Sequence, residues 1–243
     1  MYSKELARSG HSLFRIRGSY IYIVIAIGIL IAWCSGRVGP FADEGANQIW
    51  FWVSLLVASG AALLRIIVGG YAALGTSGNA KKAAEASELN TTGPYSLVRN
   101  PLYVGRILNF TGIAMLSGSW VFGALVFLIS VLIYERISIY EEDYLIQKFG
   151  DAHRKWASEV PALLPRLHGW VKPKYPFWWR RAIRREYKKL FQLASAVFLF
   201  DFARRDFTLP EDLGWYYVYA AIVALRLAIG AARQFGKVFE GVN

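Results

Sequence analysis

Two polar segments of the chain combine side chains that bind charged groups with turns that fix their position. The first covers residues 92–105, where Gly93-Pro94 marks a turn and Asn100 precedes Pro101. A residue before proline avoids helical geometry, whereas proline suits the first helical position, so we expect a helix that begins at Pro101 with Asn100 as its N-cap. The amides of such a helix end attract a carboxylate or phosphate beside Arg99. The alternative is a capped helix whose Arg99 only reaches toward lipid headgroups.

The second polar segment covers residues 141–150 and begins with Glu141, Glu142 and Asp143. Three successive acidic groups repel one another unless a cation lies near, so this segment suits a positively charged ligand or partner. The alternative is a solvated helix end whose acidic groups pair with Lys148 and Arg136.

Long apolar runs are the elements that must position these segments. Hydrophobic residues make up 55% of the chain and charged residues only 19%, and the charges cluster between apolar runs. A bilayer core requires roughly 20 helical residues, which predicts an all-α, polytopic membrane protein with about six spans: residues 19–35, 49–70, 102–116, 120–139, 190–203 and 215–232. The run at 190–203 is short and carries Asp201, so four or five spans with an interfacial helix, or four with a peripheral C-terminal hairpin, stay open.

The distribution of basic residues predicts the orientation. If the first span leaves the cytoplasm, the outer loops hold only Arg37, Arg204 and Arg205 of the 28 Lys and Arg residues. Cytoplasmic loops are enriched in Lys and Arg, so we expect a multi-pass protein with both termini and both polar segments on the cytoplasmic side.

Composition also argues against other classes of protein. The net charge of +11 lies beside apolar segments rather than on a solvated face, so membrane lipids rather than nucleic acid are the expected partners. The single cysteine, Cys34, rules out a disulfide within the chain. The three histidines have no ligand-like spacing, and we expect no metal site. No obligate protein partner is evident.

Taken together, the two polar segments resemble a known family. Residues 99–105 read Arg-Asn-Pro-Leu-Tyr-Val-Gly after Gly93-Pro94-Tyr95, which is similar to the family element Arg-His-Pro-x-Tyr-x-Gly. The run Glu-Glu-x-x-Leu-Ile-x-x-Phe-Gly from Glu141, followed by Val-Pro-Ala-Leu-Leu-Pro at 160–165, resembles its second block. The family is the isoprenylcysteine carboxyl methyltransferases and their relatives, including phospholipid methyltransferases, and the likeness covers about residues 90–170.

The resemblance implies an enzyme, a membrane methyltransferase that binds S-adenosylmethionine at the cytoplasmic face. It implies a methyltransferase core at residues 1–173 and leaves residues 174–243 as an extension, for which membrane anchoring is the simplest role. Asn100 stands where the family has histidine, which puts any role of an imidazole there in doubt. The cofactor-binding residues implied are Tyr95, Arg99, Asn100, Pro101, Tyr103, Gly105, Glu141 and Glu142. For the cofactor's carboxylate we expect the helix-end amides, and for its ammonium or ribose the glutamates.

The acceptor is expected to be lipid-like or lipid-anchored and acidic. An amine or thiol must lose a proton to a nearby base, whereas a carboxylate or phosphate needs only cations to hold it. Arg106, Arg136 and Arg166 are available for this catalytic role, and Arg166 is the preferred candidate. The alternatives are N- or S-methylation of a phospholipid or small molecule, or a non-catalytic lipid-binding scaffold of the same fold. A transporter ranks last, because polar residues are sparse in the middle of the spans.

Overall fold

The computed structural model describes residues 2–76 and 86–235, and within these ranges it contains only helices, connecting loops and one isolated bridge between Thr76 and Ala86. The elements are α1 (Tyr2–Ile16), α2 (Tyr20–Ser35), α3 (Glu44–Tyr71), the 3-10 turn η1 (Gly93–Ser96), α4 (Pro101–Met115), α5 (Trp120–Phe149), α6 (Asp151–Glu159), α7 (Trp179–Arg204) and α8 (Gly214–Phe235).

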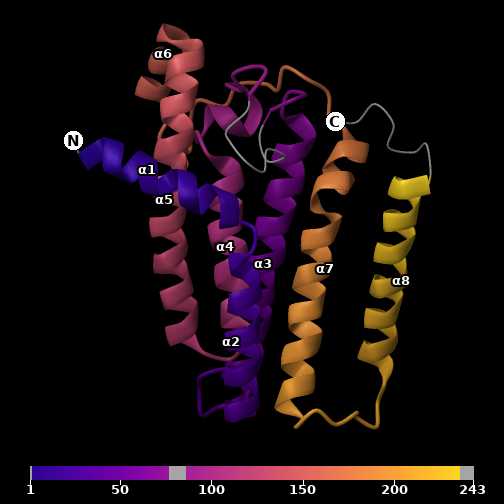
Figure 1. The fold of residues 1–243 in the computed structure, drawn as a ribbon. Helices are drawn as coiled ribbons and strands as arrows, with labels where there is room; N and C mark the ends of the chain where they lie inside the picture. Colours follow the sequence, from indigo (N-terminus) through magenta and orange to yellow (C-terminus); the bar gives the residue numbers. More distant parts are fainter. Residues whose placement is uncertain (1, 77–85, 236–243) are drawn as a thin grey trace.

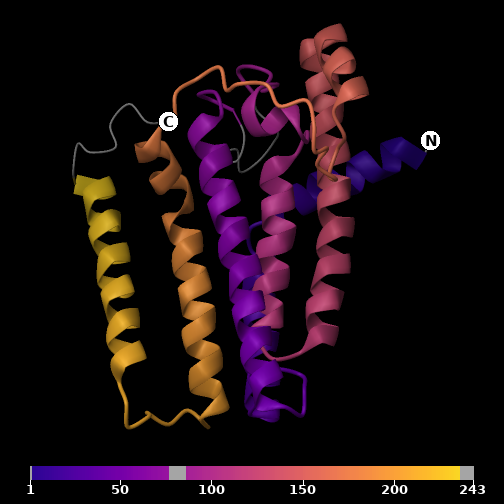
Figure 2. The ribbon, with the colours of Figure 1, turned by 180° about the vertical axis from the view of Figure 1, so that it is seen from behind.

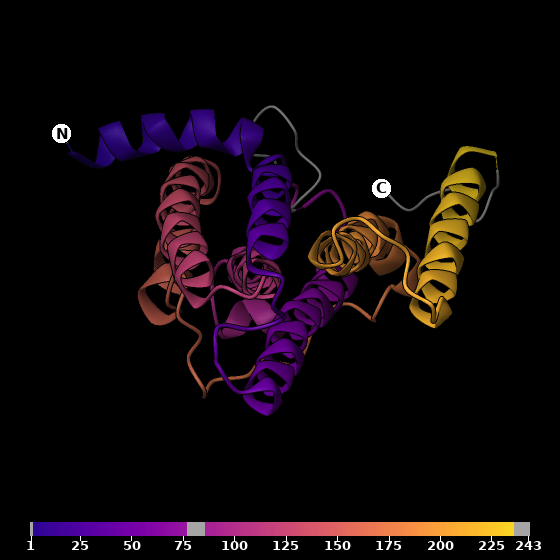
Figure 3. The same cartoon turned by 90° about the horizontal axis from the view of Figure 1, so that it is seen from below.

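The long helices form a bundle. Figure 1 and, from behind, Figure 2 show α2, α3, α4, α5, α7 and α8 running side by side along one axis. Seen from below in Figure 3, α1 crosses α5 on the outside of the bundle, and α8 stands apart and packs against α7. The bend between α1 and α2 is 63°. The predicted all-α membrane fold is confirmed.

In the part of the chain that the structure describes, three helices are long and apolar enough to cross a membrane, namely α3, α5 and α8, and the bent pair α1 and α2 raises the number to four. Two of the other predicted spans correspond to short helices, because α2 has 16 residues and α4 has 15. These lengths fall below the roughly 20 residues that a straight span needs. The three long apolar helices, α3, α5 and α8, nevertheless make the chain an integral membrane protein.

The helix boundaries follow local chemistry. Asp43 caps α3 by accepting a 2.6 Å bond from the amide of Ala46, and the hydroxyl of Ser119 caps α5 at Phe122. As predicted, α4 begins at Pro101. The predicted boundary at residue 190 is wrong, because α7 already begins at Trp179 and includes the basic stretch. Arg, Lys and Glu are good helix formers, and several in this stretch find partners in the bundle.

Small residues bring α3 and α4 together. A Cβ at position 112 would lie 2.6 Å from the backbone nitrogen of Ala58, and Asn109 donates a 2.9 Å hydrogen bond to the carbonyl of that same alanine. Without a hydrophobic driving force inside the bilayer, such close contact and interhelical hydrogen bonds hold helices together. The α3–α4 pair is thus fixed in register in the second half of α4.

Replacing Gly112 should open this contact. Because a leucine side chain at position 112 meets the backbone of α3, we expect Gly112→Leu to destabilise the protein by about 1–3 kcal/mol or more. Gly60→Leu on α3 is the matched control, since nothing lies within 4 Å of a Cβ there. Thermal unfolding in detergent measures both. Equal unfolding temperatures for the two variants would contradict the packing argument.

The topology gives a second prediction. The described start of α1 and the end of α8 lie toward the same end of the bundle (Figure 1). Together with the positive-inside rule this favours two cytoplasmic termini. Reporter fusions at each terminus, active only in the cytoplasm or only outside it, measure the orientation, and one terminus found outside overturns it.

Candidate functional site

A pocket of about 100 Å³ opens at the start of α4, between the end of α3, the C-terminal third of α5 and the loop that precedes η1. It brings residues from both polar segments together. Its lining comprises Arg17, Arg65, Thr76, Ala86, Glu88, Leu89, Asn90, Tyr95, Arg99, Asn100, Pro101, Leu102, Tyr103, Arg106, Glu141, Tyr144, Leu145 and Trp156.

An ion pair joins the two polar segments. The Nε and Nη2 atoms of Arg99 donate to the two carboxylate oxygens of Glu142 at 2.9 and 3.3 Å, and the side chains are only 16% and 22% exposed. The Nη1 atom donates to the carbonyls of Ala157 and Val160 at 2.6 and 3.1 Å. Arg99 thus lines the pocket while its charge is balanced by Glu142, which does not line it.

The segment after α6 returns to the start of α4. The amides of Arg99 and Asn100 donate to the carbonyls of Pro161 and Ala162 at 2.8 and 3.2 Å. Since Pro101 has no N–H, these bonds leave little of the helix-end amide site expected for a carboxylate. Asn100 occupies the N-cap position, but its side chain makes no capping bond and donates to the carbonyl of Ala162 at 3.3 Å. Asn100 is thus the N-cap residue by position, as predicted, but without a side-chain cap, and binding of a carboxylate by the helix-end amides stays a prediction.

Aromatic side chains form one wall of the pocket. Tyr95 lies in η1, which Gly93 enters with a φ of +60°, and Trp156 from α6 donates to the carbonyl of Tyr95 at 3.3 Å. Tyr144 from α5 completes this wall. Flat apolar rings of this kind suit a planar base or a delocalised cation.

The lining also contains the polar side chains of Tyr103, Glu141, Arg106 and Arg17. Arg106 donates at 2.9 Å to the backbone carbonyl of Arg17, in the elbow between α1 and α2, and the hydroxyl of Tyr134 donates to the same oxygen at 3.0 Å. Within residues 2–76 and 86–235, Arg106 forms no ion pair. No described carboxylate therefore lies within ion-pair distance of its guanidinium.

An acidic side chain faces the pocket from the loop before η1. Hydrogen bonds from Lys174 and from the hydroxyl of Tyr175, the latter at 2.6 Å, lower the pKa of Glu88. Glu88 is therefore ionised at neutral pH and supplies a negative charge at the mouth of the site.

The remaining predicted residues lie outside the pocket lining. Gly105 faces α3, where a Cβ would lie 2.5 Å from the Cγ atom of Arg65, so it makes room for that side chain. Arg136 donates to the carbonyl of Leu132 in its own helix at 3.1 Å. Arg166 donates to the carbonyls of Ser96 and Glu159 at 3.1 and 2.9 Å, which ties its loop to η1.

Two pocket arginines, Arg17 and Arg65, were not among the predicted site residues. Arg65 is a single charge inside an otherwise apolar predicted span, and an ionisable residue within a span is by itself an indication of a functional site. Arg17 carries no such signal, because it belongs to a basic N-terminal stretch. Among the described residues no three acidic, histidine or cysteine side chains come together as metal ligands.

Comparisons with known proteins support the family predicted from the two motifs. Residues 51–152 match the family described as phospholipid methyltransferase. The chain is 30% identical over 147 residues to the nickel-cobalt-cadmium resistance protein NccN of Alcaligenes xylosoxydans xylosoxydans. It is 35% identical over 79 residues to the cobalt-zinc-cadmium resistance protein CzcN of Cupriavidus metallidurans, and 34% identical over 79 residues to the protein-S-isoprenylcysteine O-methyltransferase of Schizosaccharomyces pombe.

These matches are partial. They cover 60%, 32% and 32% of this chain, and 64%, 36% and 34% of the three relatives. No solved structure matches the chain. The predicted family resemblance is confirmed, and the family match contains α4, η1 and most of the pocket.

The ion pair of Arg99 and Glu142 yields a prediction for ligand binding. Because the pair fixes one pocket wall, we expect Arg99→Ala to weaken S-adenosylmethionine binding by at least about tenfold, and Glu142→Gln to weaken it less because the amide still accepts a hydrogen bond. Calorimetry on folded protein in detergent measures both. Arg154→Ala removes an exposed ion pair on α6 and serves as the control. Unchanged affinity in Arg99→Ala and Glu142→Gln would refute the pocket assignment.

Proposed function

We propose, from the phospholipid methyltransferase segment at residues 51–152 and the pocket that it surrounds, that this protein transfers a methyl group from S-adenosylmethionine to a lipid-like or lipid-anchored acceptor. The observation that supports this most is the convergence of both motif segments on one pocket at one end of an apolar helix bundle. A hydrophobic acceptor reaches such a site from the bilayer, while the polar donor reaches it from the aqueous side.

The side chains of the pocket fit the chemistry of the donor. Bound S-adenosylmethionine supplies an electrophilic methyl group on a positively charged sulfonium. Tyr95, Tyr144 and Trp156 offer rings to the adenine and to the positive charge, and Glu141 offers a carboxylate to the ammonium or the ribose. The pocket of about 100 Å³ is smaller than usual for such a ligand, so binding requires side chains of the lining to move apart.

Arg106 is the residue that we assign to the acceptor. Of the three arginines expected to hold an acidic acceptor, it is the one that lines the pocket. Arg65 and Arg99 also line it, but each is paired with a carboxylate. An ionised carboxylate or phosphate held by Arg106 would need no base, and its alignment with the methyl group would supply much of the rate. This favours O-methylation.

A second candidate is N-methylation of a phospholipid headgroup. Its support is Glu141, which lines the pocket near Arg106 and Tyr103 and is a possible acceptor for the proton that an amine must lose. The first two relatives are named for metal resistance. Nothing in the pocket chemistry requires a metal for either methyl transfer.

The methylated product distinguishes these possibilities. Purified protein reconstituted in bilayers of native lipid extract, given donor with a labelled methyl group, should yield label in the lipid fraction. A methyl ester of a carboxylate releases volatile methanol in base, whereas a methylamine does not, so base-stable label identified as a methylamine selects the second candidate.

Further outcomes of the same assay test the assignment of Arg106 and the function itself. We expect Arg106→Gln to reduce turnover by about 10²-fold or more, with Arg154→Ala unchanged. Donor binding without any labelled lipid would indicate the non-catalytic scaffold, and absence of donor binding would refute the proposed function.

A further inference from the structure

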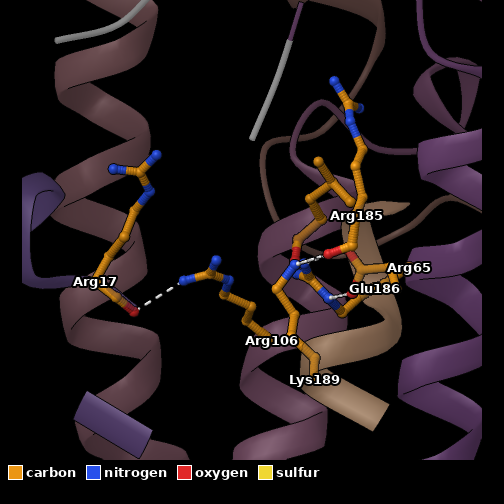
Figure 4. Close-up of polar contacts among 7 residues, drawn as sticks. Arg17, Arg65, Arg106, Arg185, Glu186 and Lys189 are labelled. Carbon is orange, nitrogen blue, oxygen red and sulfur yellow. Dashed lines mark hydrogen bonds and ion pairs between the residues drawn. The ribbon is translucent and has the colours of Figure 1, made fainter. Parts of the chain in front are cut away.

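One face of α7, which lies outside the family match, is bonded to the elements that build the pocket. Figure 4 shows Glu186 and Lys189 of α7 meeting Arg65 of α3, with Arg185 beside them and Arg106 on the side toward Arg17. These contacts suggest a role for α7 beyond anchoring the chain in the membrane.

The central contact is a buried, two-pronged ion pair. The Nε and Nη2 atoms of Arg65 each donate to one oxygen of Glu186 at 2.9 Å, and the two residues are 4% and 3% exposed. The remaining Nη1 of Arg65 donates at 2.8 Å to the carbonyl of Leu102, in the first turn of α4. Lys189 adds a second cation to Glu186 at 2.9 Å. Arg65 thus joins α3, α4 and α7 in one network.

Two neighbouring arginines of α7 hold the segment that follows α3. Arg181 donates to the carbonyls of Gly69 and Gly70 at 3.1 and 3.2 Å and to that of Ala72, which satisfies acceptors that a helix end leaves open. Arg185 donates at 2.9 Å to the carbonyl of Thr76, a residue of the pocket lining. The same face of α7 therefore fixes both the end of α3 and the loop beyond it.

Stability alone does not explain the ion pair. Arg65 lies six residues before the end of α3, about 9 Å along the helix, inside a candidate span. Buried ion pairs are often matched or exceeded in stability by apolar residues of similar volume. Moreover, Gly105 has to lack a side chain so that Arg65 passes α4 on its way to Glu186. The position of the Arg65 guanidinium at the pocket therefore requires both a glycine at position 105 and a carboxylate at position 186.

We propose that Glu186 is a positioning residue: it holds Arg65 as a wall of the pocket beside Leu102, so that α7 and the family segment build the donor site together. This inference rests on the proposed function, because it assumes that the pocket binds S-adenosylmethionine. It assigns to the C-terminal part of the chain a direct effect on ligand affinity.

The experiment separates positioning from stability. The double variant Arg65→Met/Glu186→Leu replaces the ion pair by apolar residues, so we expect a thermal unfolding temperature in detergent close to that of the wild type. We also expect it to bind S-adenosylmethionine at least about tenfold more weakly by calorimetry. The matched control is Arg205→Met/Asp201→Leu, which applies the same replacement to an ion pair at the far end of α7 and should leave affinity unchanged.

Each outcome decides the proposal. Wild-type affinity in the stable double variant overturns it, and so does an equal loss in the control. If the double variant does not fold, Glu186→Gln, which keeps the shape of the side chain, is measured below its unfolding temperature. Weaker binding there supports the proposal and unchanged binding overturns it. A wild-type protein that fails to bind the donor refutes the proposed function itself, a result that the variants do not mimic.

Discussion

The ion pair between Arg99 and Glu142 is the contact on which the arrangement of the site depends. Its partners are 43 positions apart in the chain, and they meet because α4 and α5 are joined by a short turn and run back along each other. Arg99 also donates hydrogen bonds to the carbonyls of Ala157 and Val160 at the end of α6, and the chain beyond α6 returns to the start of α4. The mostly buried pair of Arg99 and Glu142 thus joins the α4–α5 hairpin to the segment after α6, and these elements together surround the pocket.

The sequence predicted the helices and motifs around the pocket better than the hydrogen bonds between segments that are distant in the chain. The proline at position 101 predicted where α4 begins, and the order of the two motif blocks predicted the family. The amides of Arg99 and Asn100, just before α4, are not free to bind an anion, because they donate to the carbonyls of Pro161 and Ala162. Nothing in the local spacing of residues 160–165 carries that information. The basic stretch before residue 190 was read as separate from the apolar run, although arginine and lysine continue a helix wherever bundle partners accept their bonds.

Buried charges in the bundle have two different roles. Arg65 and Arg99 each have a carboxylate that accepts two of their bonds, so they shape the pocket without adding net charge to it. Arg106 donates to the backbone carbonyl of Arg17 and forms no ion pair within the described residues, which is why we assign it to the acceptor. Inside a low-dielectric bundle this difference matters more than the number of arginines, because an unbalanced charge there interacts strongly with any anion that enters. Partner residues, which are distant in sequence, therefore determine which arginine is structural and which is available.

The elbow between α1 and α2 connects the first helix of the chain to the pocket. The carbonyl of Arg17 at this bend accepts hydrogen bonds from Arg106 and Tyr134, while α1 extends outward from the bundle (Figure 3). A change in the tilt of α1 would move that oxygen and remove an acceptor from the guanidinium within the pocket. A single peptide group at this bend thus links the position of the first helix to the guanidinium of Arg106.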